Sequence, residues 1–553
     1  MSEWNEKGWS NEVLAFEVIR ACWQAGCREF VLCSGSRNSP LVLELLRLEQ
    51  EDQRGELKIW NFFEERAAAF FALGRAKISG LPTAVVTTSG TAAAELLPAV
   101  IEAHYSGLPL LLVTADRPPH FRRSGAPQAI DQENLYGENV NLFLDVSAHH
   151  YSDLEDLPDF LLERESAVRW HINVAFEEPL VAGDEGGGGS LQGLEKIDPA
   201  DERYDDWEMV EDFIDKSGDV VVLIGCLSPS ERSAELVQAL AELALPIWLD
   251  AGSGLRESNI LYPLVIKDEQ KFFTHFSNKG NGRVLRLGGV PSLRFWRDLE
   301  SLDDIEVLSL APAGEFSGLG RISAVAMEDV TAGLRLLAEA LGGNETRDEV
   351  KGTGRLDVLL EKYPQSEPAW MRKLSQGIPV GSQVYLGNSM PIREWNLAAT
   401  FEDRALSCFA SRGANGIDGQ VSTYFGLSAD AKESWGVFGD LTALYDLSAP
   451  WVLNQLGEGK RRLVVINNGG GRIFSRLPHL ARLDESQKQV TENRHQIDFK
   501  HWAAMWSMDY LRVVTADGWK AEQIEGKETL VIELCPDLEQ TEAFWRDYVK
   551  EDS

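Results

Sequence analysis

The sequence predicts an α/β fold made of three doubly wound parallel sheets. Short apolar segments alternate with helix-length segments along most of the chain, and such alternation predicts parallel sheets with helices on both faces. The chain has 553 residues, which is too long for one core and indicates about three domains. A glycine-rich segment, 183–190, and a charged segment, 342–354, separate the three parts.

In the first part of the chain, apolar strands alternate with helices. We expect strands at 28–33, 58–63, 83–88 and 109–115 and helices at 40–51, 64–79 and 90–106. Pro98 lies inside the last of these helices. Because proline lacks a backbone N–H group, it predicts either a kink there or the first turn of a helix.

The second and third parts contain strands of the same kind. Those expected in the second part are 220–224, 246–249, 284–287 and 305–310. Those expected in the third part are 383–386, 435–438, 463–466 and 529–534. The first and third parts resemble two versions of one architecture, each with polar loops after strand ends, where ligands bind in open parallel sheets.

Composition and charge disfavour several functions. The formal net charge is −34 at pH 7, whereas nucleic acids and anionic membranes require a basic face. The chain has no run of 18 apolar residues and no signal-peptide pattern, so we expect neither a membrane span nor export. Its six cysteines lack metal-ligand spacing and are expected to be reduced in a cytoplasmic protein. Walker A and Gly-x-Gly-x-x-Gly patterns are absent from the sequence.

The most specific pattern lies at the ends of two predicted strands in the third part. Asp440 follows one strand and offers a carboxylate, and Asn468, 28 residues later, follows the next and offers an amide oxygen. The glycines at 469–471 let a backbone carbonyl and N–H groups approach the same ion and a diphosphate. Mg²⁺ prefers such hard oxygen ligands. The pattern is typical of a thiamin diphosphate site.

Glu65 lies where a predicted strand gives way to an alanine-rich helix. Taken alone, an acid at this position is more often present because the helix dipole favours it. Thiamin diphosphate chemistry, however, needs one carboxyl in an apolar site to bond a pyrimidine ring nitrogen of the cofactor. Together with the metal motif, this need favours Glu65 as the catalytic carboxyl.

Four arginines follow predicted strands beside small residues: Arg37, Arg117, Arg393 and Arg412. Each alone is more often a solvated charge. Four together, in a chain this acidic, indicate a pocket for a substrate with more than one carboxylate, since arginine pairs with carboxylates through two parallel hydrogen bonds.

Several motifs follow one another in the order of a single family. They are 33–40, 64–66, 88–92, 114–119, 125–128, 387–389, 412–419, 439–441 and 467–468. Over nearly its whole length the chain resembles the thiamin diphosphate-dependent 2-succinyl-5-enolpyruvyl-6-hydroxy-3-cyclohexene-1-carboxylate synthase family of menaquinone biosynthesis. Gly-Asp-Leu at 439–441, in place of the Gly-Asp-Gly of most thiamin diphosphate enzymes, is specific to this resemblance.

The resemblance implies three domains of the thiamin diphosphate enzyme type: pyrimidine-binding (1–183), central (191–345) and diphosphate-binding (355–553). It implies that the cofactor is bound by Glu65, Ser389, Ile417, Gly439, Asp440, Leu441, Thr442, Asn468, Gly470 and Ile473. Among these, Asp440, Asn468 and the Gly470 carbonyl would hold Mg²⁺ or Mn²⁺, and Ile417 would bend the cofactor.

The resemblance also implies a substrate pocket and an oligomer. The pocket residues are Ser36, Arg37, Arg117, Gln128, Arg294, Arg393, Arg412, Phe474 and Leu477. Family members are homodimers or homotetramers in which the cofactor lies between the first domain of one subunit and the third domain of another.

The implied reaction is decarboxylation of 2-oxoglutarate and 1,4-addition of the resulting carbanion to isochorismate. Two alternatives remain open. One is another thiamin diphosphate enzyme, such as an acetolactate synthase-like carboligase or a 2-oxo acid decarboxylase, which would have less use for four arginines. The other is a non-catalytic scaffold of the same fold, against which Glu65, Asp440 and Asn468 count because function is argued from the site.

Overall fold

The computed structural model describes residues 9–151, 154, 168–181, 189–197, 207–311, 316–320, 325–326, 330–341, 354–477, 479–515 and 523–550. Most of the predicted linker 183–190 and of the charged segment 342–354 lies outside the described residues. The chain forms two compact units. Unit 1 comprises 1–202, 422–429 and 448–456, and unit 2 comprises 203–421, 430–447 and 457–553.

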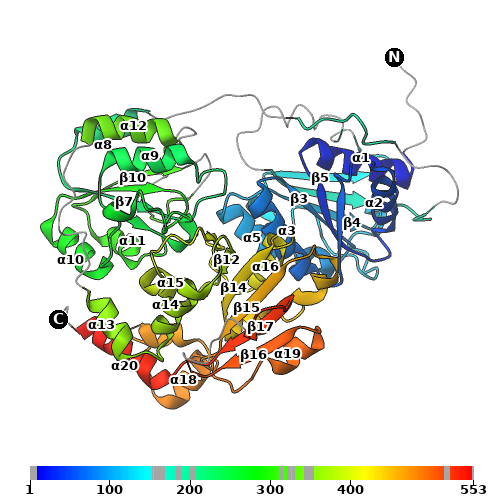
Figure 1. Cartoon of the computed structure of the whole chain (residues 1–553). Coiled ribbons are helices and arrows are strands. Elements are labelled where there is room, and N and C mark those ends of the chain that lie inside the picture. The colour runs from blue at the N-terminus through cyan, green and yellow to red at the C-terminus, as the bar shows by residue number, and fades with distance from the viewer. Residues whose placement is uncertain are drawn as a thin grey trace. The chain divides into compact units, whose positions relative to one another are not determined.

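Unit 1 contains a parallel sheet of six strands in the order β2-β1-β3-β4-β6-β5 (Figure 1). The strands are β1 Glu29–Cys33, β2 Lys58–Phe62, β3 Thr83–Thr87, β4 Leu110–Asp116, β5 Leu142–Ser147 and β6 Arg169–Ala175. The helices are α1 Asn11–Gln24, α2 Ser39–Glu51, α3 Glu65–Ser79, α4 Thr91–Ala94 and α5 Leu97–Tyr105. The four strands predicted for this part are all present.

The predicted helix 90–106 is divided into α4 and α5. Pro98 lies in the first turn of α5, where its missing N–H group breaks no helical hydrogen bond. This is one of the two outcomes predicted for that proline.

Unit 2 contains two parallel sheets, the first in the order β11-β10-β9-β7-β8. Its strands are β7 Val220–Ile224, β8 Ile247–Leu249, β9 Arg283–Leu287, β10 Glu306–Ala311 and β11 Val325–Ala326. Its helices are α8 Trp207–Asp215, α9 Ala234–Leu243, α10 Glu269–Lys279, α11 Arg294–Asp298 and α12 Val330–Leu341. Helices α8, α9 and α12 lie along one face of this sheet, and α10 and α11 lie along the other (Figure 1).

The other sheet of unit 2 has six strands in the order β13-β12-β14-β15-β17-β16. They are β12 Gln383–Leu386, β13 Ser407–Phe409, β14 Glu433–Gly439, β15 Lys460–Ile466, β16 Asp509–Val513 and β17 Thr529–Leu534. The helices of this part of the chain are α13 Arg355–Lys362, α14 Glu367–Gly377, α15 Met390–Ala398, α16 Gln420–Leu427, α17 Asp440–Tyr445, α18 Glu485–Thr491, α19 Lys500–Met505 and α20 Leu538–Val549. Most of α16 is assigned to unit 1.

The two six-stranded sheets have the same topology. Numbered within each sheet by their order along the chain, both have their strands in the order 2-1-3-4-6-5. The prediction that the first and third parts are two versions of one architecture is therefore confirmed. In such an order the chain reverses its direction of growth between the first and third strands, and ligands bind at the carboxyl ends near that point.

Continuous apolar strands form the cores. All residues of β3 are buried, as are all residues of β7, which is expected for strands covered on both faces. Cys22 and Cys27 are free and buried. Burial of each large aliphatic side chain contributes about 1.5–3 kcal/mol, so these strands fix the positions of the loops that follow them.

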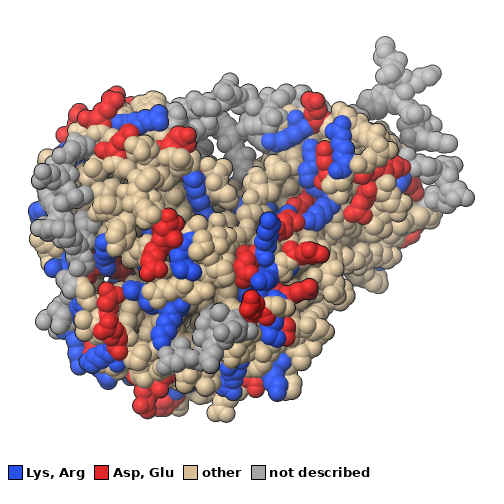
Figure 2. All heavy atoms as spheres, viewed as in Figure 1, with Lys and Arg blue, Asp and Glu red and all other residues tan. Residues whose placement is uncertain are grey.

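The surface carries both signs of charge despite the acidic balance of the chain. Figure 2 shows basic and acidic side chains interspersed over the displayed face of the described residues. Within the described ranges, every helix is too short or too polar to traverse a bilayer.

Candidate active site

Asp440 and Asn468 follow two adjacent strands of the third sheet. Strands β14 and β15 pair in parallel, with Gly439 opposite Ile466, so both side chains stand at the same edge. Asp440 accepts hydrogen bonds from its neighbour Leu441 N (2.7 Å) and from Gly470 N (2.9 Å). The carboxylate of the first strand is thus tied to the glycine loop that follows the second.

Burial raises the pKa of the Asp440 carboxyl, although the Gly470 N–H and the nearby His495 oppose the rise. His495 Nε2 lies 3.3 Å from Asp440 Oδ2. A carboxylate with this little water around it gains most from a positive partner.

The two polar atoms of the Asn468 side chain have different surroundings. Its Nδ2 donates to Glu367 Oε1 at 2.8 Å. Its Oδ1 is buried and, among the described residues, has no hydrogen-bond partner. A buried carbonyl oxygen without a partner is costly, and a bound cation would satisfy it. The donor set therefore fits Mg²⁺ or Mn²⁺, with oxygen ligands from a carboxylate and an amide.

No group of three His, Cys, Asp or Glu side chains suited to a metal occurs in the part of the chain that the structure describes. A magnesium site of the predicted kind does not need one, because backbone carbonyls, amides and phosphate oxygens complete the shell.

The glycine loop permits the close approach that the site requires. Gly469 and Gly470 have φ values of +75° and +137°, which side-chain-bearing residues rarely adopt. A Cβ atom on Gly470 would lie 2.6 Å from Glu492 O. Arg472 Nε in turn donates to Asn468 O at 3.2 Å, which holds the start of the loop.

We expect Gly470→Ala to weaken Mg²⁺ and thiamin diphosphate binding by about 10-fold or more, because φ strain of about 1–3 kcal/mol and the clash displace the N–H group that bonds Asp440. Calorimetric titration of the purified variant measures this. Gly526→Ala is the matched control. Gly526 also has a positive φ (+75°), but a Cβ there meets no atom within 4 Å. Equal binding by the two variants would contradict the assignment.

Glu367, which accepts the hydrogen bond from Asn468 Nδ2, forms a pair with a second buried glutamate. Glu367 begins α14 and Glu394 belongs to α15, and both are almost inaccessible to solvent. Burial raises the pKa of Glu367 and raises that of Glu394 well above its usual value. No sequence pattern indicated Glu367, which is 101 residues from Asn468.

The loops after β12 and β13 are joined through Asn388. Its Nδ2 donates to Ser411 O (2.9 Å) and Gly416 O (2.8 Å), and its Oδ1 accepts from Arg412 Nη1 at 2.9 Å. The following residue, Ser389, has a φ of +73° and begins the turn into α15, where Arg393 donates to Ser389 O. Asn388 was not among the predicted site residues, although it lies inside the predicted Gly-Asn-Ser motif.

The remaining predicted residues of this sheet lie on the loops at its carboxyl edge. Ile417 is partly buried in the loop after β13, and Gly439, Leu441 and Thr442 surround the start of α17. Ile473 and Phe474 lie in a short 3₁₀ turn, Arg472–Arg476, directly after the glycine loop, and Leu477 follows it, exposed. The structure brings these residues to the same edge as Asp440.

Glu65 is the first helical residue of α3 in unit 1. The preceding acid, Glu64, is the N-cap, and its side chain accepts hydrogen bonds from Arg66 N and Ala67 N. Capping is thus the task of Glu64, and Glu65 is not needed for it. Burial raises the pKa of Glu65, and the nearby Glu64 and Glu95 add to the rise.

The raised folded-state pKa of Glu65 makes its contribution to the free energy of unfolding depend on pH. The contribution is fully present below the unfolded-state pKa, about 4.3, and is lost as pH rises through the higher folded-state value. We expect the apoprotein of Glu65→Gln to match the wild type at acidic pH and to melt at a higher temperature at neutral pH. Thermal melts from pH 4 to 8 measure the difference. A constant difference across this range would contradict it.

Ser36 and Arg37 follow β1, at the point where the sheet of unit 1 reverses its growth. Ser36 is exposed. Arg37 is buried, and its Nη2 donates to Glu178 Oε1 at 2.9 Å. The Glu178 side chain is 60% exposed, so a bound carboxylate could replace it without burying an unpaired charge.

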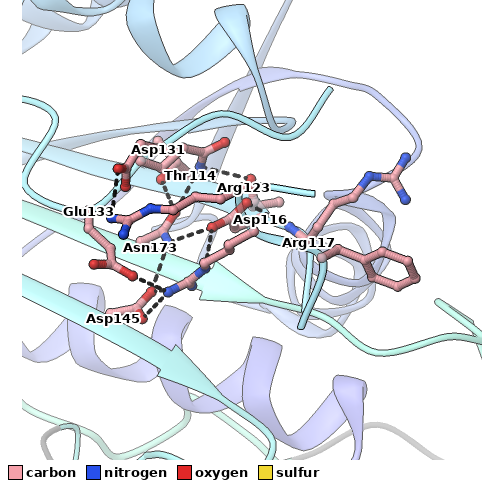
Figure 3. A network of polar contacts seen from close by, with 12 residues as sticks. Thr114, Asp116, Arg117, Arg123, Asp131, Glu133, Asp145 and Asn173 are labelled. Atoms are coloured by element: carbon pink, nitrogen blue, oxygen red, sulfur yellow. Dashed lines mark hydrogen bonds and ion pairs between the residues drawn. The ribbon is translucent and has the colours of Figure 1, made fainter. Parts of the chain in front are cut away.

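Arg117 and Gln128 begin and end a loop after β4. Arg117 Nε donates to Pro127 O at 2.9 Å, and Gln128 is exposed with a φ of +56°. Figure 3 shows the Arg117 side chain directed away from the carboxylates near it. The guanidinium is thus kept apart from the acids of its own loop.

A buried polar network holds this loop (Figure 3). Arg122 contacts Asp116 at 3.2 Å and Asp145 at 2.6 Å. Asn173, in the neighbouring strand β6, donates to both of these carboxylates, at 3.0 and 2.8 Å. Gln132 adds a bond from its Nε2 to Asn173 Oδ1 at 2.8 Å. The hydrogen bonds that Arg122 donates to Asp145 are the main reason that the pKa of Arg122 is raised.

We expect Arg122→Met to lower the free energy of unfolding by about 3 kcal/mol, because it leaves the buried carboxylate of Asp116 without its cationic partner. The side chains of Arg122 and Asp116 are 13% and 1% exposed. Arg123→Met is the control. Arg123 pairs with Asp131, but its side chain is 75% exposed, so the loss should stay below about 1 kcal/mol. Denaturant melts followed by circular dichroism compare the two, and similar losses would contradict the prediction.

Two further features belong to unit 2. Arg294 begins α11, and its side chain is 82% exposed and only 3.7 Å from Asp298, which is a weak pair. A cavity of about 560 Å³ is lined by residues including Trp248, Arg256, Arg372 and Phe401. None of the described residues that line it is a predicted site residue.

Comparisons with known proteins identify the family of this chain. Residues 14–135 match a family model described as "Thiamine pyrophosphate enzyme, N-terminal TPP binding domain". Two relatives, from Bdellovibrio bacteriovorus and Akkermansia muciniphila, are both named 2-succinyl-5-enolpyruvyl-6-hydroxy-3-cyclohexene-1-carboxylate synthase. The first is 38% identical, with 98% of this chain and 99% of the relative aligned, and the second is 41% identical, with 95% and 96% aligned.

A relative of the same name from Chloroflexus aurantiacus is 31% identical, with 90% of this chain and 88% of the relative aligned. Alignments of this extent span at least nine-tenths of the chain. The chain is a thiamin diphosphate-dependent enzyme and belongs to the 2-succinyl-5-enolpyruvyl-6-hydroxy-3-cyclohexene-1-carboxylate synthase family.

Proposed function

We propose that this enzyme decarboxylates 2-oxoglutarate and adds the remaining four-carbon unit to isochorismate by 1,4-addition. The products are 2-succinyl-5-enolpyruvyl-6-hydroxy-3-cyclohexene-1-carboxylate and CO₂. The single observation that carries the proposal is the bond of Asp440 to the glycine loop beside the Asn468 carbonyl oxygen, which is buried without a hydrogen-bond partner among the described residues.

We propose that Asp440, Asn468 and the Gly470 carbonyl hold Mg²⁺ or Mn²⁺. The metal would join the protein to the diphosphate of the cofactor. The other cofactor contacts come from Ser389, Ile417, Gly439, Leu441, Thr442 and Ile473. When bound, thiamin diphosphate supplies the carbanion chemistry that lets a 2-oxo acid lose CO₂.

Glu65 is the proposed proton partner of the pyrimidine ring. Burial raises the pKa of its carboxyl, and this shift favours the protonated form, which is the form that can donate a hydrogen bond to a ring nitrogen. Because Glu65 is not the cap of α3, its position follows from this task better than from helix stability.

We propose that arginines bind and orient the substrates, since both substrates are dicarboxylates. Arg37, Arg117, Arg393 and Arg412 supply planar donors that fix carboxylate orientation as well as charge. The proposed pocket also includes Ser36, Gln128 and Arg294, with Phe474 and Leu477 on its apolar side.

We also propose the assembly, the domain bounds and the location. The domains would be 1–183, 191–345 and 355–553, as the sequence predicts. The enzyme would act in the cytoplasm as a homodimer or homotetramer, with each cofactor held between the first domain of one subunit and the third of another.

The test is an assay of purified protein with thiamin diphosphate, Mg²⁺ and both substrates, followed by CO₂ release and mass spectrometry of the product. Release of CO₂ and formation of the adduct support the proposal. Absence of both would refute it. A panel containing pyruvate and other 2-oxo acids separates the proposal from an acetolactate synthase-like carboligase or a 2-oxo acid decarboxylase, which would prefer smaller, less anionic substrates.

A further inference from the structure

The amide of Asn468 can present either its oxygen or its nitrogen to a cation, and only one orientation is useful. Asparagine carries an acceptor and a two-hydrogen donor of nearly the same shape. A metal ligand must present the oxygen. Some neighbouring group must therefore select the orientation before the ion arrives, or part of the binding energy is lost in selecting it.

Glu367 is the group that contacts the other end of the amide. Its Oε1 accepts the hydrogen bond from Asn468 Nδ2 at 2.8 Å, and the pair is buried. Glu367 is 2% exposed and is fixed at the first turn of α14, where its backbone N–H donates to Thr541 Oγ1 at 3.1 Å. The acceptor is therefore held by the fold and not by the metal site.

We propose that Glu367 is a positioning residue, which accepts from Nδ2 and thereby directs the Asn468 carbonyl oxygen to the divalent cation. This inference rests on the metal site of the proposed function. It assigns Glu367 no contact with the cofactor or the substrates. Residues that hydrogen-bond to the ligands of a metal commonly contribute about 10- to 100-fold to metal affinity.

A purely structural role is the competing interpretation, since buried polar groups are usually bonded to one another. The two interpretations differ in what an exchange of partners does. A structural pair tolerates any combination that fills the space. A positioning pair works only when one member donates and the other keeps an oxygen free for the ion.

The experiment exchanges the two functional groups. Asn468→Asp alone places a carboxylate against Glu367, and the repulsion should weaken Mg²⁺ binding about 100-fold. Glu367→Gln alone leaves an amide that can turn either way, so a loss of about 10-fold is expected. In the double variant the new amide at 367 donates to the new carboxylate at 468, and one carboxylate oxygen is again free. Affinity should recover to within about 10-fold of the wild type.

Mn²⁺ binding followed by electron paramagnetic resonance, together with calorimetric titration of Mg²⁺ in the presence of thiamin diphosphate, provides readouts that do not depend on turnover. Circular dichroism checks the fold of each variant. If Asn468→Asp does not fold, Glu367→Met takes its place, with a loss of about 100-fold expected. Glu542→Gln is the control, because Glu542 is half-exposed and pairs with Arg476, whose charge acts on Glu367.

A double variant that binds no better than Asn468→Asp, or a Glu367→Met variant that binds like the wild type, would overturn the inference. Failure of the proposed function gives a different result, because the wild-type protein itself would then bind neither Mn²⁺ nor Mg²⁺ with thiamin diphosphate. Recovery of metal affinity in the double variant, with the affinity of Glu542→Gln unchanged, would support the inference on Glu367.

Discussion

Glu65→Gln should lower turnover by about 10²- to 10⁴-fold, the usual contribution of a positioned acid or base, while thiamin diphosphate still binds. Glutamine has the shape of glutamate and can still contact the ring nitrogen, but it has no exchangeable carboxyl proton. The step that should fail is activation of the cofactor. Exchange of the C2 hydrogen for deuterium, followed by NMR, measures that step without either substrate.

Glu64→Gln is the matched control for this change. Glu64 lies one residue earlier and caps α3, and its side chain also accepts from Ser448 Oγ at 2.8 Å. Its replacement should cost up to about 1 kcal/mol of stability, as loss of an N-cap does, and leave C2 exchange near the wild-type rate. Unchanged exchange in Glu65→Gln would remove this residue from its proposed role.

Asp440→Ala should abolish useful metal binding. Removing one partner of a buried, hydrogen-bonded charge pair costs about 2–5 kcal/mol, which corresponds to an affinity weaker by roughly 30- to 4,000-fold. The variant also leaves the Gly470 N–H without its acceptor, so the glycine loop loses its tie to β14. Titration of Mg²⁺ in the presence of thiamin diphosphate gives the affinity, and activity should fall in parallel.

Asp440→Asn retains the shape of the side chain but not its charge, and it should bind Mg²⁺ nearly as weakly. The control is Asp484→Ala. Asp484 is an exposed aspartate that caps α18 in a capping box, so its loss should reduce stability by about 1 kcal/mol and leave metal affinity unchanged. Wild-type affinity in Asp440→Asn would show that the carboxylate is not a ligand.

The fold was predictable where strands are apolar throughout. The sequences of β3, β7 and β14 directly predict buried parallel strands. Strand β6 was missed because it contains His171 and Asn173, polar residues that suggest a loop. Both are fully buried, and their cost is met by bonds to Thr114 at 2.8 and 2.9 Å. Those partners lie in another strand, which a sequence read alone does not reveal.

The two edge strands of the third sheet were missed for a different reason. Strand β13 has three residues, and β16 is an edge strand with a charged, partly exposed sequence. Strands at an edge bury less and are often charged to discourage further pairing. Their sequences therefore lack the apolar pattern on which the prediction depends.

The candidate site was predictable where function requires a rare residue type at a strand end. Asp440, Asn468 and the glycines follow from the ligand preferences of Mg²⁺ and from the need for positive φ. Glu367 could not be predicted in this way. It acts through one hydrogen bond across 101 residues of sequence, and a glutamate at the start of a helix is ordinarily explained by the helix dipole.

The shared strand order of the two six-stranded sheets gives each loop a counterpart. The second-strand position carries Glu65 in one sheet and the Arg412–Ile417 turn in the other. The fourth-strand position carries Arg117 in one and Asn468 in the other. One repeated scaffold thus offers equivalent loop positions twice, and under the proposed function the first sheet supplies the proton partner of the cofactor and the second holds its diphosphate. Grafting a loop between equivalent strand ends of the two sheets is therefore a rational route to redesigning this enzyme.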